Sequence, residues 1–249
     1  MSSLADADLL HVWETMRRQS LPRRAAALLA AATPGLSAPQ LSAMSLGERE
    51  RRLLQLRIDC FGPRLDCVAD CAGCGEAFEF ELDARRLADS LNAPDAAANP
   101  LVIETGDYRI DIRLPTVDDC IAIADAPDAS DAEGAYRLLL RRCLDCSTRE
   151  GDRVAPEALP AALLQQAAAR VEAADPANEL LLSLPCPACG ALATQPLDMA
   201  AFCWAEIEAR APRLLAEVDA LASRYGWHEA DILALSRVRR DAYLGMALS

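Results

Sequence analysis

Two short phrases of the form Cys-x-x-Cys-Gly, at residues 71–75 and 186–190, carry the clearest chemical signal in this sequence of 249 residues. Two cysteines separated by two residues can turn both sulfurs onto one tetrahedral ion, and the glycine that follows tolerates the positive φ of the tight turn. Strand-like runs precede and follow each phrase, so each predicts a hairpin knuckle. Together the knuckles predict a zinc ribbon with one structural Zn²⁺ per chain. The predicted ligands are Cys71, Cys74, Cys186 and Cys189.

Disulfides and unmetallated thiols are the alternatives to a metal site. Ten cysteines are too few for a disulfide-dense scaffold, and the first residues contain no secretory signal pattern, so we expect reduced thiols in the cytoplasm. A third pair with the same spacing, Cys143 and Cys146, lacks the glycine and the flanking strands, and we interpret it as part of a helix face. The remaining cysteines are expected to be small buried hydrophobic residues: Cys60, Cys67, Cys120 and Cys203.

A catalytic role for the metal is not expected. Four thiolates would fill a tetrahedral coordination shell and leave no open position for a reacting water. The two histidines, His11 and His228, lie away from both knuckles in the sequence. Phosphate-binding, nucleophile-elbow and dinucleotide-binding motifs are also missing from the sequence. We therefore predict a protein that is not an enzyme and has no catalytic residues.

The charge of the chain argues against nucleic acid, which is the usual ligand of a zinc ribbon. The formal net charge is −13, so the long-range field repels phosphate. All 25 basic residues are arginines, and their pairs are scattered along the chain among acidic residues. No apolar run approaches the roughly 20 residues that span a bilayer. We expect a cytoplasmic protein that neither binds nucleic acid nor inserts into a membrane.

The pattern of apolar residues predicts an α+β fold that is mainly α-helical, with a four-cysteine zinc-ribbon-like β element and an additional β-hairpin. Alanine and leucine dominate, which favours helix, and a chain with 52% apolar residues can bury a sizeable core. Three regions are predicted. They are an N-terminal helical region at 1–63, a zinc-ribbon region at 64–197 and a C-terminal helical region at 198–249. The zinc-ribbon region has its knuckles at 64–82 and 178–197, and the β-hairpin and several helices are inserted between them.

Capping and breaking residues predict the element boundaries. Helices are expected at 23–32 after Pro22, at 46–59 behind a capping box that Ser45 begins, and at 117–124 behind Thr116. The alternating residues 101–114 predict a hairpin, and helices are expected at 131–144 and 156–174. Segments rich in proline, at 33–39 and 92–100, are expected to be loops. A long helix is expected from Asp198 to Tyr225, followed by helices at 229–235 and 237–248.

Aromatic residues are scarce in the chain, but several fall in the C-terminal region. One interpretation, which we favour, is that they hold the C-terminal helices together; the other is that they form an exposed patch for a partner. On the second interpretation the candidate partner-binding residues are Trp204, Glu206, Tyr225, Trp227, Arg239, Arg240 and Tyr243.

The C-terminal sequence also resembles a known family. Three strings are Phe-Cys-Trp-Ala-Glu-Ile-Glu at 202–208, Tyr-Gly-Trp-His-Glu-Ala-Asp-Ile-Leu at 225–233 and Arg-Arg-Asp-Ala-Tyr-Leu at 239–244. Together they resemble the C-terminal signature of the T4-type baseplate hub assembly chaperones. Residues 46–54, 61–63 and 113–116 resemble cellular members of the same family. These pieces cover most of the chain, and the C-terminal strings are the most specific.

The resemblance implies a protein encoded with a contractile phage tail or a phage-like injection system. It implies binding to hub and spike proteins during baseplate assembly, with later release or retention in the finished particle, and it brings no catalytic residues. Zinc would then stabilise the fold without touching the partner. Two hypotheses follow: a non-enzymatic assembly factor or baseplate component, supported by the C-terminal strings, and a zinc-ribbon protein that regulates through nucleic acid, supported by the knuckles alone.

Overall fold

The computed structural model describes residues 4–91, 101–129 and 131–247; the first three residues and the predicted loop at 92–100 lie outside this part. The helices are α1 (Asp6–Met16), α2 (Leu21–Ala32), α3 (Ala38–Ser42), α4 (Leu46–Phe61), α5 (Ala84–Leu91), α6 (Val117–Asp125), α7 (Ala132–Cys143), α8 (Ala161–Ala174), α9 (Met199–Tyr225), α10 (Glu229–Leu233) and α11 (Arg237–Ala247). The 3₁₀ turns are η1 (Pro127–Ala129), η2 (Pro156–Ala158) and η3 (Pro176–Asn178). The strands are β1 (Arg64–Asp70), β2 (Ala77–Asp83), β3 (Leu101–Glu104), β4 (Tyr108–Ile112), β5 (Leu144–Thr148), β6 (Leu181–Pro185) and β7 (Leu192–Pro196).

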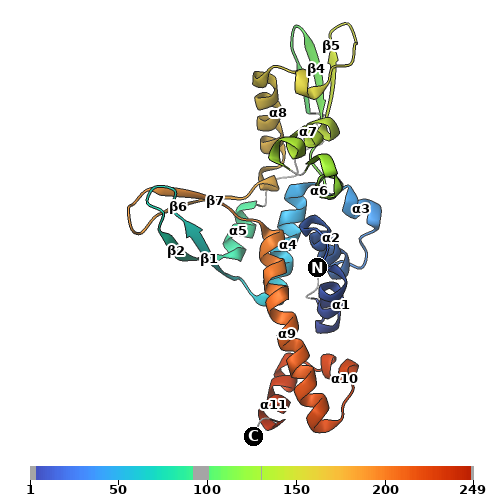
Figure 1. The fold of residues 1–249 in the computed structure, drawn as a ribbon, viewed down its shortest axis with the longest axis vertical. Coiled ribbons are helices and arrows are strands. Elements are labelled where there is room, and N and C mark those ends of the chain that lie inside the picture. The colour runs from blue at the N-terminus through green and yellow to red at the C-terminus, as the bar shows by residue number, and fades with distance from the viewer. Residues whose placement is uncertain (1–3, 92–100, 130, 248–249) are drawn as a thin grey trace.

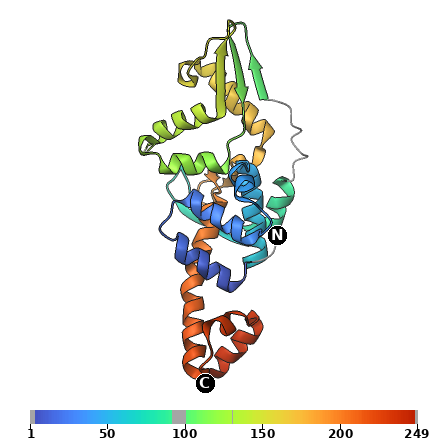
Figure 2. The ribbon, with the colours of Figure 1, turned by 90° about the vertical axis from the view of Figure 1, so that its right-hand side faces the viewer.

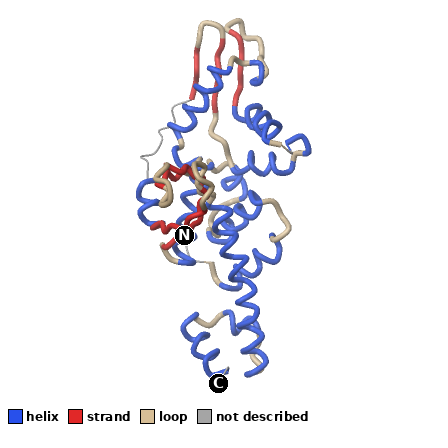
Figure 3. The backbone as a smooth tube through the Cα atoms, turned by 60° about the vertical axis from the view of Figure 1, so that its left-hand side comes forward, coloured by secondary structure: helices blue, strands red, loops and turns tan. Residues whose placement is uncertain are grey.

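The molecule is elongated around a central helical body (Figure 1). A three-stranded sheet with α7 and α8 forms one end, and the last part of α9 with α10 and α11 forms the other (Figures 1 and 2). The hairpins β1–β2 and β6–β7 project together from one side of the body (Figure 1). Figure 3 shows that helix dominates, with strands confined to the hairpins and the end sheet, which confirms the predicted mainly helical α+β fold. Among the described helices, none combines the length and the apolar character that crossing a bilayer requires.

The central body is built around one hydrophobic core. Its fully buried side chains include Leu28 of α2, Leu53 and Leu54 of α4, and Ile207 and Leu214 of α9. The predicted regions 1–63 and 198–249 therefore both contribute to this core, although the chain between them forms the hairpins and the end sheet. Residues from distant parts of the sequence meet on α4, which lies at the centre.

The N-terminal end of α4 receives a carboxylate from far along the chain. Asp175 is buried, and its Oδ2 accepts the backbone N–H of Gly47 at 2.8 Å. A Cβ at residue 47 would lie 1.8 Å from Asp175 Oδ1, so only glycine allows this approach. In turn, Glu50 of α4 is buried and accepts the backbone N–H of Met199, the first residue of α9, at 3.1 Å. Each carboxylate satisfies a free N–H at a helix start, where the helix dipole also favours negative charge.

The C-terminal end of α4 is fixed to the first hairpin. Arg57 is buried, donates to the carbonyl oxygen of Gly62, and forms a 2.6 Å ion pair with Glu206 of α9. The backbone N–H of Ala84 donates to the carbonyl oxygen of Pro63 at 2.7 Å, which closes the base of β1–β2. Helix α4 thus contacts the chain just before β1, and it also contacts the chain before β6 and after β7.

The end sheet differs from the prediction by one strand. The predicted hairpin at 101–114 is present as β3 and β4, but β5 pairs with β4 and places Cys146 opposite Ile110. α7 ends at Cys143 because Leu144 has extended backbone, with φ −116° and ψ 130°. The interpretation of Cys143 and Cys146 as one helix face is therefore wrong: Cys146 is a buried strand residue in the core of the end sheet.

The expected proline loop and the start of α8 also differ from the prediction. Residues 38–42 form the short helix α3, which overlaps the end of the loop expected at 33–39, because Ser37 and Gln40 make a capping box there. α8 begins at Ala161 and not at residue 156, because residues 156–158 form a 3₁₀ turn and Leu159, which precedes Pro160, has extended backbone with φ −68° and ψ 147°.

Candidate metal centre

The two Cys-x-x-Cys-Gly phrases form the same turn at the tips of the two side hairpins. In the first, the Cys71 N–H donates to the Glu76 carbonyl at 3.0 Å and the Gly75 N–H donates to the Cys71 carbonyl at 2.7 Å. The second repeats this pattern with distances of 2.8 and 2.9 Å. Gly75 and Gly190 have φ values of 76° and 74°, the left-handed region that glycine adopts without strain. The predicted knuckles are thus both present.

The two tips meet, and the four predicted cysteines form one cluster. All four Sγ atoms lie within 4.8 Å of one another. Cys71 Sγ lies 3.7 Å from Cys189 Sγ, and Cys74 Sγ lies 3.8 Å from Cys186 Sγ. These separations are far longer than a disulfide bond, and all four cysteines are free. Four sulfurs that converge from two hairpins are a set that can hold a metal ion.

The surroundings of the cluster are half protein interior and half surface. Cys71 and Cys186 are buried, and they pack with Ala69, Phe78 and Ala193 in a small core between the hairpins. Cys74 and Cys189 are exposed, so a small ion can reach the sulfurs from solvent.

Backbone donors and neighbouring thiols set the acidity of the first knuckle. The N–H groups of Cys74 and Gly73 point to the Cys71 sulfur and lower the pKa of this thiol to about 7. The Cys74 sulfur receives the N–H of Glu76, which lowers its pKa, but hydrogen bonds with the other thiols raise the pKa of Cys74 to about 12. The Cys74 thiol therefore holds its proton to a higher pH than the Cys71 thiol does. A metal ion would bind the thiolates, so its uptake would release protons and weaken at low pH.

A second cluster of charge, around Asp119, fixes α6 to α7 and to the end of β4. Asp119 is fully buried and accepts from the Thr116 N–H at 2.8 Å, which completes the predicted cap of α6. Both of its oxygens also accept from Arg113, at 2.6 and 2.7 Å, and Arg142 of α7 donates to Oδ1. Burial alone would raise the pKa of Asp119, but the arginine and threonine donors outweigh it and hold the pKa far below the usual range. This cluster is saturated with internal partners.

The candidate partner-binding residues fall into two groups by their surroundings. Trp204 is buried in the central core under the Arg24 guanidinium, which lies 4.6 Å from its ring centroid. Glu206 is paired with Arg57. Both side chains contact the body and not the end of the molecule.

The other aromatic candidates meet at the C-terminal end. Tyr225 and Trp227 stack with ring centroids 4.8 Å apart, and Tyr243 of α11 meets both rings edge-on, at 5.9 and 4.8 Å. These three rings join α11 to the end of α9, as the favoured interpretation predicts for them. Arg239, by contrast, is exposed.

Arg240 is fully buried, in an ion-pair network that the sequence analysis missed. It pairs with Asp6 of α1 and, at 2.8 Å, with Glu217 of α9; Arg210 pairs with the same two carboxylates at 3.9 and 2.6 Å. Asp6 and Arg240 are 234 positions apart, so no local pattern could have revealed their contact.

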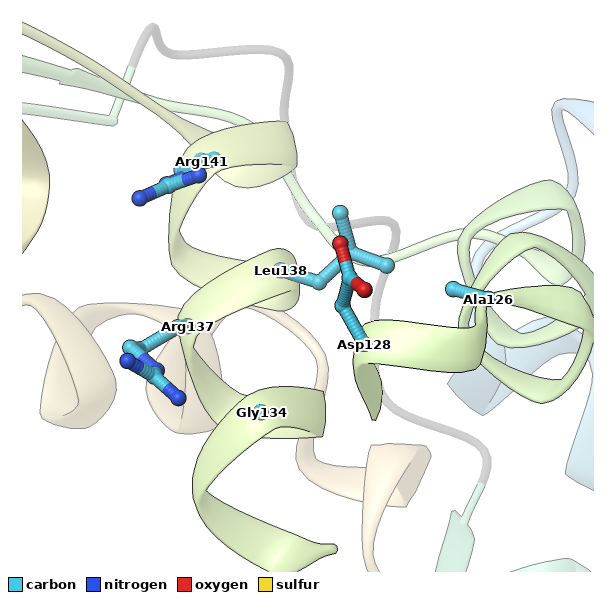
Figure 4. A pocket seen from close by; sticks show the side chains of 6 residues that line it. All are labelled: Ala126, Asp128, Gly134, Arg137, Leu138 and Arg141. Atoms are coloured by element: carbon cyan, nitrogen blue, oxygen red, sulfur yellow. The ribbon is translucent and has the colours of Figure 1, made fainter. Parts of the chain in front are cut away.

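A hollow of about 360 Å³ lies between η1 and α7 (Figure 4). Gly134 permits the close approach of the two elements, because a Cβ there would lie 2.1 Å from the Asp128 carbonyl oxygen. Figure 4 shows Arg137 and Arg141 pointing away from Asp128, so the labelled side chains do not converge on one point. The four-cysteine cluster is therefore the stronger candidate site. Comparisons of the chain with protein-family models, with curated proteins and with solved structures give no match.

Proposed function

We propose that the four-cysteine cluster binds one zinc ion, which cross-links the two side hairpins. Zn–S bonds of about 2.3 Å in a tetrahedron place the sulfurs about 3.8 Å apart. The two closest Sγ pairs, at 3.7 and 3.8 Å, match this spacing. Four thiolates would complete the coordination shell, which fits a structural role.

Metal analysis of the purified protein tests this proposal. We expect about one zinc per chain, and its loss together with a large fall in melting temperature in the Cys186→Ser variant, because structural zinc contributes on the order of 10 kcal/mol of binding free energy coupled to folding. Cys67→Ser is the matched control, because Cys67 lies on β1 outside the cluster. A protein that carries another metal, or Cys186→Ser protein that keeps its zinc, would contradict the proposal.

We further propose that the whole chain is a non-enzymatic assembly factor that binds hub and spike proteins of a contractile tail or injection system. The observation that carries this proposal is the C-terminal sequence, whose strings resemble those of hub assembly chaperones. Its distal residues build a separate helical end in which three aromatic rings and the buried Arg240 hold α11 on α9. A rigid, protruding helical end is suited to protein contacts.

Co-expression with the hub and spike proteins encoded nearby tests the assembly role. We expect a hub protein to co-purify with this chain, and deletion of the gene to reduce the number of sheathed particles seen by electron microscopy. If no complex forms and particles are normal without the gene, the assembly role is wrong.

The charge of the first hairpin argues against nucleic acid as the partner. The outward side chains of the first hairpin are mostly acidic, and the exposed ones include Asp66, Asp70, Glu79 and Glu81. Carboxylates repel phosphate, and a zinc ribbon that grips nucleic acid needs the opposite charge. Salt-dependent binding to DNA or RNA would favour the regulatory hypothesis instead.

A further inference from the structure

An apolar groove lies between α7, α8 and the segment that leads into β6. Its volume is about 270 Å³. α7 lines it with Tyr136, Leu139, Leu140 and Cys143. α8 lines it with Leu164, Ala167, Ala168 and Val171. Both sets follow the i, i+3, i+4, i+7 spacing of one helix face. α7 and α8 do not pack along their lengths, so each leaves part of an apolar face uncovered.

Two large apolar side chains at this groove are open to solvent. Tyr136 is 50% exposed and Leu181, the first residue of β6, is 55% exposed. Single exposed apolar residues are common on protein surfaces, but a groove that is apolar along two helices and has two such residues at its rim is typical of a binding surface. The structure offers no element of the described chain that covers it.

The charges at the groove indicate the kind of partner. Its charged lining residues are Glu172 of α8 and Glu179, both exposed, and both are acidic. The arginines of α7 lie elsewhere: Arg137 and Arg141 line the separate hollow shown in Figure 4. An occupant with arginine or lysine beside its apolar residues would therefore meet complementary charge.

We propose that this groove binds an amphipathic helix of a partner protein, with an apolar stripe inside the groove and basic residues over Glu172 and Glu179. A helix anchored by residues at i, i+3, i+4 and i+7 is the usual occupant of an apolar groove between helices. The inference rests on the proposed function, because it assigns the binding of a partner protein to a surface distinct from the C-terminal end.

A labelled helical peptide with leucines at i, i+3, i+4 and i+7 and flanking arginines is a suitable probe. Binding is measured by fluorescence anisotropy at about 0.15 M salt, where exposed charges farther apart than about 8 Å are largely screened. We expect binding to the wild-type protein and at least about tenfold weaker binding both to Leu181→Asp and to the Glu172→Arg, Glu179→Arg double variant. A scrambled peptide of the same composition should bind the wild-type protein no more tightly than the helical peptide binds the variants.

Leu192→Asp is the matched control. Leu192 lies on β7 of the same hairpin, is 73% exposed, and does not line the groove, so its variant adds the same charge elsewhere. Equal weakening by Leu181→Asp and Leu192→Asp, or equal binding of the scrambled peptide, overturns the proposal. Circular dichroism and metal content verify that each variant is folded.

The outcome is separable from that of the assembly role. If a hub protein co-purifies but Leu181→Asp leaves the affinity for the peptide unchanged, the groove proposal fails and the assembly role stands. If the peptide binds in the groove but no hub protein co-purifies, the assembly role fails and the groove remains a binding surface for a different partner.

Discussion

Polar contacts from three different segments meet at the buried carboxylate of Asp119. Its carboxylate joins the end of β4, the start of α6 and the last turn of α7 through Arg113, Thr116 and Arg142. Because the carboxylate is fully buried, the contacts are exchanged for water only on unfolding. One ionised side chain therefore ties the end sheet to the central body.

The lowered pKa of Asp119 predicts a pH dependence of stability. An unfolded aspartate titrates near 3.9, and the folded pKa lies below that value, so the stabilisation is complete above about pH 5 and is lost as the pH falls through 4 and below. Asp119→Asn should lower the free energy of unfolding by about 1.5–3 kcal/mol at pH 7. Urea titrations at several pH values should show the gap between wild type and variant narrowing below pH 4; a constant gap would contradict the assignment.

At the residue scale, the sequence predicts the four-cysteine cluster better than the ion pairs. Cys71 and Cys186 could be identified because spacing, glycine and flanking strands are local properties. Arg240 was grouped with exposed candidates, since neither its burial nor its pairing with Asp6 leaves a trace near position 240. The exposure of the groove residue Leu181 was also missed. The sequence pattern of a strand does not show whether another element of the fold covers a given side chain.

The central element is α4. Its N-terminal end depends on residue 47 being a glycine, which has no side chain. Gly47 allows Asp175 to cap the helix, so Gly47→Ala would force the carboxylate away and leave the N–H without its partner. We expect a loss of about 1–3 kcal/mol in the free energy of unfolding, measured by urea denaturation. Gly35→Ala is the control, because a Cβ there meets nothing within 4 Å and the change should stay within about 0.5 kcal/mol. Equal effects of both changes would refute the role of Gly47.

Elements with a cap or a terminator were predicted well. Thr116 is the N-cap residue of α6, and Gly226 ends α9 with left-handed backbone. Both boundaries follow from the type of a single residue, which the sequence shows directly. β5 was missed because the helix pattern of α7 runs directly into it with no intervening turn, and its strand character depends on pairing with β4. For such a segment, pairing with a strand elsewhere in the fold decides whether it forms helix or strand.

At the scale of the whole molecule, the proposed metal ion would cross-link the two side hairpins. The small core between the hairpins includes two of the cysteines themselves, and an isolated two-stranded hairpin is only marginally stable in water. The central core and the end sheet have apolar clusters of their own. Stability should therefore depend on metal unequally across the molecule.

Removal of the metal by a chelator should expose this difference. We expect amide hydrogen exchange to rise strongly in β1, β2, β6 and β7, and to change little in β3, β4 and β5, which contain no ligand. Mass spectrometry of exchanged peptides makes the comparison within one sample. Uniform acceleration would mean that the ion supports the whole fold, and no acceleration would mean that it does not stabilise the hairpins.

The distance between the two knuckles has a consequence for synthesis on the ribosome. Cys186 follows Cys74 by 112 positions, so at about 5–20 residues per second the second pair is made on the order of 6–22 s after the first. During that interval the first hairpin is half of a site, with two thiols and no partner knuckle. The proposed ion could be fully enclosed only after the end sheet has been synthesised, so the proposed cross-link would form late in the synthesis of the chain.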